Sequence, residues 1–132
     1  MPRDDVSTSL DTNGVWVGLD LSDIPPHSAA MDTLSRLEAT IAARHGGDPE
    51  ASYVAKLMLK GLPEVARKVG EEAVETAIAA VAYEREEVVG EAADLIFHLL
   101  ILLRARGIKL ADVLAELERR EGTSGIAEKA AR

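Results

Sequence analysis

Two pairs of carboxylates with helical spacing are the residues of this sequence best suited to chemistry. Glu72 and Glu75 form one pair, and Glu91 and Asp94 form the other. Residues three or four apart lie on one face of a helix. Two helices joined by a short turn near residues 83–86 should pack antiparallel, which brings both pairs to a similar height. The sequence therefore predicts one site built from four carboxylates.

Carboxylates that converge in this way repel one another and lose hydration unless a cation joins them. Mg²⁺ fits this need, with Mn²⁺ as the alternative, because both take oxygen ligands and bridge to phosphate oxygens. A solvated acidic face is the competing interpretation, and it is favoured for Glu71, Glu72 and Glu75 taken alone. It is weaker for Glu91 and Asp94, because their helix is otherwise apolar and their stripe is expected to be covered.

His98 follows Asp94 by four residues and therefore lies in the same stripe. It could bind the metal, shuttle a proton or hydrogen-bond to Asp94, and we predict that it supports a ligand without binding the metal itself. A di-iron bundle is disfavoured because it needs Glu-x-x-His on two helices, and the spacing from Glu91 to His98 is seven.

Cations that precede the acidic cluster could bind phosphate. Lys56 and Lys60 are one helical turn apart, and Arg67 and Lys68 follow. Lysines pair with phosphate as point charges, although ordinary solvated lysines fit the pattern equally well. The Ser124-Gly dipeptide near the C-terminus could offer backbone N–H groups to an anion, which is a weak signal. Taken with the carboxylates, these residues indicate a Mg²⁺-dependent site for a phosphorylated ligand.

The elements that must position these residues are helices. Apolar residues recur with a helical period from Asp32 onward, and glycine or proline separates the runs. The expected helices cover about 32–45, 52–60, 63–82, 86–106 and 110–120. We predict an all-α fold, a bundle of four to five helices around a central antiparallel hairpin.

The first 31 residues differ from the rest, with five acidic residues and one basic residue. Residues 14–21 could form a strand, but no partner strand is visible and a lone strand is unstable. We therefore predict a mobile N-terminal extension over residues 1–31 and an all-α domain over residues 32–132.

The expected 86–106 helix is apolar around nearly its whole circumference, apart from the stripe that holds the carboxylates. Four other short helices can hardly wrap it. We predict that a homodimer completes the bundle, with a monomer around a buried central helix as the alternative.

The composition is that of one globular domain, with 132 residues of which 47% are hydrophobic. A net charge of −8 argues against nucleic-acid binding, which needs clustered cations. The absence of cysteine excludes disulfides and fits a cytoplasmic protein. The longest apolar run, residues 95–103, is too short to span a membrane, and no signal peptide is predicted.

The paired carboxylates resemble the signature of the all-α nucleoside-triphosphate pyrophosphatases. Within that superfamily, the sequence is most similar to the phosphoribosyl-ATP pyrophosphatase family of histidine biosynthesis. The segments that carry this resemblance are residues 52–57, 68–75, 91–100 and 120–129.

The resemblance implies hydrolysis of phosphoribosyl-ATP between its α- and β-phosphates, giving phosphoribosyl-AMP and pyrophosphate. It implies four Mg²⁺ ligands, which are Glu72, Glu75, Glu91 and Asp94. Glu71 is the first candidate to activate water, and three lysines would neutralise phosphate charge, namely Lys56, Lys60 and Lys68. The tail with Ser124 and Lys129 would close over a ribose phosphate.

Two other functions stay open at this point. One is a house-cleaning pyrophosphatase of the same superfamily that acts on free or damaged nucleotides, which the tail motif disfavours. The other is a non-enzymatic helical dimerisation module whose acidic stripe is only solvated, for which Mg²⁺ would not raise thermal stability.

Overall fold

The computed structural model describes residues 9–10, 16–17, 27–121 and 129–130. Its helices are α1 (His27–Arg44), α2 (Tyr53–Leu59), α3 (Leu62–Ala82), α4 (Arg85–Ala105) and α5 (Leu110–Arg120). Two strands of two residues each, β1 (Ser9–Leu10) and β2 (Trp16–Val17), pair antiparallel. Helices therefore build the fold, and the predicted all-α class is confirmed.

Local signals explain where most helices begin and end. The Ser52 side chain caps α2, accepting a hydrogen bond from the Ala55 N–H at 3.3 Å. Pro63 lies in the first turn of α3, where its missing N–H costs nothing. Gly61 and Gly107 have φ of 95° and 68°, which a residue with a Cβ rarely adopts, and they stand before α3 and after α4. These boundaries agree with the sequence prediction.

Two features near the N-terminus differ from the prediction. Helix α1 begins at His27, not at Asp32, because the residues after Pro25-Pro26 are compatible with a helix but carry no apolar period to reveal it. The expectation that no strand would pair with residues 14–21 is wrong, because β2 pairs with β1. The division of the chain after residue 31 and the mobility of residues 1–31 stay predictions.

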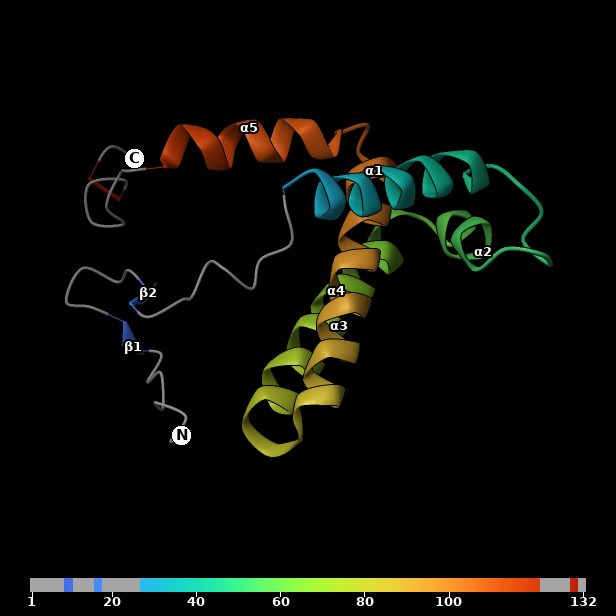
Figure 1. Ribbon diagram of the computed structural model, residues 1–132. Coiled ribbons are helices and arrows are strands. Elements are labelled where there is room, and N and C mark those ends of the chain that lie inside the picture. The colour runs from blue at the N-terminus through green and yellow to red at the C-terminus, as the bar shows by residue number, and fades with distance from the viewer. Residues whose placement is uncertain (1–8, 11–15, 18–26, 122–128, 131–132) are drawn as a thin grey trace.

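The central feature is the hairpin of α3 and α4, which run antiparallel and side by side with a turn at Tyr83 and Glu84 (Figure 1). Helix α1 crosses the end of α4 that is far from this turn (Figure 1). Helix α2 lies near the same end of the hairpin, and α5 extends away from the hairpin (Figure 1). The predicted central antiparallel hairpin is confirmed.

The buried core lies at the end of the hairpin that α1 and α2 cover. It consists of Ile41, Val54, Leu57, Val65, Leu100 and Ile101. The half of the hairpin near its turn leaves apolar side chains exposed, including Val74, Ile78, Val81 and Val89, and Ile96 is exposed at the middle of α4. The hairpin therefore has a covered end and an uncovered end, and the candidate site lies between them.

None of the helices in the described ranges is both long and apolar enough to cross a membrane.

Candidate metal and phosphate site

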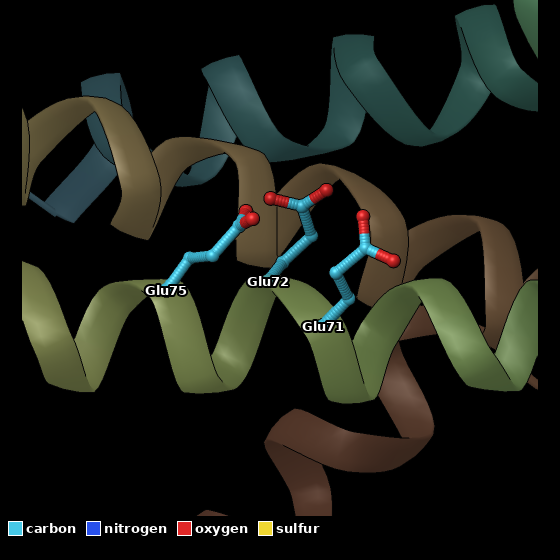
Figure 2. Close-up of side chains that lie close together, drawn as sticks. All are labelled: Glu71, Glu72 and Glu75. Atoms are coloured by element: carbon cyan, nitrogen blue, oxygen red, sulfur yellow. The ribbon is translucent and has the colours of Figure 1, made fainter.

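The predicted carboxylates converge in two groups that share one residue. In the first group, Glu71, Glu72 and Glu75 each place an oxygen within 4.8 Å of the others, and in the second, Glu72 does so with Glu91 and Asp94. Figure 2 shows Glu71, Glu72 and Glu75 projecting from α3 on the side that faces α4. Helix α3 places three carboxylates on one face because of their spacing, and the antiparallel hairpin supplies the other two.

Burial differs sharply among these groups. Glu72 is only 6% exposed, whereas Glu75 and Asp94 are exposed and Glu91 is half-buried. The expectation that the Glu91–Asp94 stripe would be covered is therefore right in part, and Asp94 departs from it. The shared residue, Glu72, is the one that the protein removes from water.

Lys68 and Arg67 already contact part of this cluster. The Lys68 Nζ lies 2.7 Å from Glu71 Oε1 and 2.9 Å from Glu72 Oε1. Arg67 pairs with the other oxygen of Glu71 and, at 2.8 Å, with Glu64. These hydrogen bonds from Lys68 and Arg67 hold the pKa of Glu71 below its usual value.

Glu75 shows the opposite effect. Loss of hydration, followed by repulsion from the neighbouring Glu72 and Glu91, raises the pKa of Glu75 above its ordinary value. A hard divalent cation such as Mg²⁺ prefers oxygen ligands, and its charge would relieve the repulsion among these carboxylates. The residues present therefore fit the predicted metal.

A cation-lined pocket adjoins the carboxylates. It has a volume of about 300 Å³ and is lined by Tyr53, Lys56, Leu57, Lys60, Glu64, Arg67 and Lys68. Lys68 belongs both to this pocket and to the carboxylate cluster. Lys56 and Lys60 have no ion pair within the described part of the chain, so their charges are available to an anionic ligand. The predicted phosphate-binding lysines are thus brought together at one place.

His98 is buried, with 5% exposure, and links two helices. Its Nδ1 lies 2.8 Å from the Asp94 backbone carbonyl, which can only accept, so Nδ1 carries the proton. In the neutral ring, Nε2 then accepts a hydrogen bond from the Tyr53 hydroxyl at 2.7 Å. The Glu72 carboxylate is 3.8 Å from Nδ1. His98 thus contacts the backbone of one carboxylate residue and lies beside another.

The sequence of the chain was compared with those of known proteins. The family model of phosphoribosyl-ATP pyrophosphohydrolase matches residues 34–121. A phosphoribosyl-ATP pyrophosphatase of Erythrobacter litoralis is 68% identical over 102 residues, covering 77% of this chain and 98% of that protein. Proteins of the same name from Novosphingobium aromaticivorans and Dinoroseobacter shibae are 68% and 60% identical, with 94% and 100% of their lengths covered. The chain belongs to the phosphoribosyl-ATP pyrophosphohydrolase family.

The region that matches the family model contains every carboxylate and pocket lysine discussed above. The two predicted tail residues lie beyond it. Ser124 is outside the described residues, and Lys129 is described and exposed. Their roles stay predictions.

Sequence reasoning missed Tyr53 and did not assign a role to Arg67. Arg67 precedes Glu71 by four residues, a spacing that indicates an ion pair on a helix. Tyr53 and His98 are 45 residues apart, and only the packing of α2 against α4 brings them together. Two signals were available in the sequence: Tyr53 lies one helical turn before Lys56, and it belongs to the segment 52–57 that carries the family resemblance.

Proposed function

We propose that this chain hydrolyses phosphoribosyl-ATP to phosphoribosyl-AMP and pyrophosphate, the second step of histidine biosynthesis. The observation that carries the proposal is the position of Glu72, which is shared by two carboxylate groups and bound by a lysine that also lines a cationic pocket. Oxygens that could bind a metal ion and cations that could bind phosphate are thereby adjacent. Membership of the family, over residues 34–121, supports the substrate.

The residues proposed to hold Mg²⁺ are Glu72, Glu75, Glu91 and Asp94, and Mn²⁺ could replace it. When bound, the cation would neutralise phosphate charge and polarise the phosphoryl group under attack. The carboxylate oxygens suit an ion that prefers oxygen ligands, and the raised pKa of Glu75 reflects repulsion that a cation would relieve.

The chain's own residues would do three things in the reaction. Glu71 would orient or deprotonate the attacking water, which breaks the bond between the α-phosphate and β-phosphate. Its ion pairs with Arg67 and Lys68 favour a role in orientation, because a lowered pKa weakens a base. Lys56, Lys60 and Lys68 would bind phosphate oxygens and stabilise the departing pyrophosphate.

His98 would support the ligands of this site. Its buried ring hydrogen-bonds the Asp94 carbonyl on α4 and lies beside Glu72. The segment with Ser124 and Lys129 would close over the ribose phosphate of the substrate.

We also propose that the chain works as a homodimer. Val74, Ile78 and Val81 form an apolar stripe on α3, and they are 58%, 50% and 90% exposed. On α4, Val89 and Ile96 are also exposed, at 55% and 44%. A second copy packed against this surface would bury the apolar side chains that the helices of one chain leave exposed.

The proposal places the reaction in the cytoplasm, where nucleotide substrates are soluble, and excludes nucleic acid and membranes as partners. The net charge of −8 supports the first of these exclusions.

Release of pyrophosphate in the presence of Mg²⁺ tests this function. Phosphoribosyl-ATP should be turned over in strong preference to ordinary nucleoside triphosphates, and a chelator should abolish turnover. Hydrolysis of the ordinary triphosphates instead would indicate a house-cleaning pyrophosphatase. No turnover of any nucleotide would favour a helical binding module.

A further inference from the structure

The hydrogen bond between Tyr53 and His98 is the feature that the proposed reaction leaves unexplained. It joins a half-exposed side chain on α2 to a buried ring on α4 at 2.7 Å. The Tyr53 ring also stands edge-on to His98, with ring centroids 5.6 Å apart, and stacks on Phe97 at 6.2 Å. The hydroxyl and the ring therefore fix the start of α2 on α4.

The direction of this hydrogen bond follows from the surroundings of His98. Its Nδ1–H is used by the Asp94 carbonyl, so Nε2 is the acceptor and the Tyr53 hydroxyl donates. Loss of hydration raises the pKa of Tyr53 above its usual value, so the hydroxyl keeps the proton that it donates.

The position of Tyr53 along α2 connects this bond to the pocket. Lys56 lies one turn after Tyr53 on α2, and Lys60 is the C-cap residue that directly follows the helix. This short helix and its C-cap therefore carry the two pocket lysines that have no ion pair within the described residues. Helix α2 has only seven residues, too few to be stable without tertiary contacts. Its apolar side chains Val54 and Leu57 hold it in the core, and the Tyr53 hydroxyl is its polar attachment to α4.

The same His98 ring that binds Tyr53 also contacts the carboxylate site. His98 is bound through its ring to the backbone of Asp94 and lies beside Glu72. Tyr53 is thus separated from the backbone of a proposed metal ligand by one imidazole ring.

We propose that Tyr53 is a positioning residue that sets the distance between the pocket lysines Lys56 and Lys60 and the carboxylates of α3 and α4. This inference rests on the proposed function, because it assigns the lysines to the substrate phosphates. It predicts that the Tyr53 hydroxyl affects substrate binding more than the chemical step, since the carboxylates remain in place without it.

The test is the variant Tyr53→Phe, which keeps the ring and its stacking and removes only the hydroxyl. The KM for phosphoribosyl-ATP should rise about fivefold, the effect of one lost hydrogen bond, while kcat and the Mg²⁺ concentration for half-maximal activity stay close to wild type. The matched control is Tyr83→Phe, because Tyr83 is exposed at the hairpin turn and makes no side-chain hydrogen bond within the described residues.

A second measurement does not depend on activity. Hydrogen exchange of the backbone amides of α2 should be faster in Tyr53→Phe than in wild type and in Tyr83→Phe, because α2 has lost its polar attachment. If the wild-type chain released no pyrophosphate, the proposed function would fail, and this measurement would still test the attachment of α2.

Coupling to the lysines completes the test. In a Lys56→Met/Lys60→Met background, adding Tyr53→Phe should change KM by less than twofold, because its effect is transmitted through those lysines. An unchanged KM in the single variant would overturn the proposal. So would a fall in kcat accompanied by weaker Mg²⁺ activation, since the hydroxyl would then act on the metal ligands, or α2 amide exchange equal to wild type.

Discussion

The ammonium of Lys68 lies 2.9 Å from Oε1 of Glu72, the buried carboxylate that belongs to both carboxylate groups. Lys68 is itself mostly covered, with a side chain that is 19% exposed, so the pair is shielded from water. A carboxylate with so little hydration depends on this partner whenever no other cation is near.

Replacing Lys68 with methionine should therefore destabilise the Mg²⁺-free protein. We expect a loss of about 2 kcal/mol in the free energy of unfolding, because the variant removes a charge-assisted hydrogen bond and leaves Glu72 buried without its ion pair. Mg²⁺ should recover more stability in this variant than in wild type. Urea unfolding with and without Mg²⁺ measures both effects. Lys60→Met is the matched control, and equal stability of the two variants would contradict the prediction.

Replacing Asp94 with asparagine should remove activity without unfolding the protein. Asp94 is exposed, so the loss of its charge leaves the core intact, but a proposed Mg²⁺ ligand is lost. We expect kcat/KM to fall about a hundredfold or more, with unchanged helical circular dichroism. The control is Glu87→Gln, an exposed glutamate one turn before Glu91 that joins neither carboxylate group in the described chain. Full activity of Asp94→Asn would remove it from the metal site.

Affinity for Mg²⁺ should depend on pH through Glu75. The pKa of Glu75 lies above its usual value, so protons compete with the cation at Glu75 at a higher pH than at an ordinary carboxylate. Ionised Glu75 binds the cation, and so affinity should be greatest at neutral pH and fall as the solution is acidified through this raised pKa. Calorimetric titration of Mg²⁺ at several pH values measures this.

In Glu75→Gln, Mg²⁺ should bind more weakly at neutral pH, and its affinity should change less on acidification. An equally steep pH dependence in this variant would show that another group titrates.

The apolar stripe on α3 should control oligomeric state. Ile78→Glu places a charge in the middle of the stripe formed with Val74 and Val81, so a dimer should dissociate into monomers. Sedimentation velocity should give twice the mass of one chain for wild type and a single-chain mass for the variant. Leu117→Glu, on an exposed position of α5, is the control and should remain dimeric. A monomeric wild type would contradict the proposed homodimer.

Most of the site could be predicted because it depends on local rules. Glu72 and Glu75 share a face through helical spacing, and a short turn between two antiparallel helices brings Glu91 and Asp94 to the same height. The glycines and Ser52 mark helix ends through backbone conformation and capping.

What escaped prediction depends on how helices pack or on very short elements. Tyr53 meets His98 only because α2 crosses α4 at a particular place, which no spacing in the sequence encodes. Paired strands of two residues are too short to show an alternating pattern, so β1 gave no signal. The exposure of Asp94 likewise reflects which face of α4 the other helices leave uncovered.

The off-centre core has a consequence for how this protein responds to dilution. The buried residues lie at one end of the hairpin, and the carboxylates stand at the boundary with the half that a single chain leaves unsupported. If a second copy packs against that half, the four proposed ligands adopt their binding arrangement only in the dimer. Specific activity would then rise with protein concentration until the dimer is saturated, and the dissociation constant of the dimer would set the concentration at which the enzyme becomes competent.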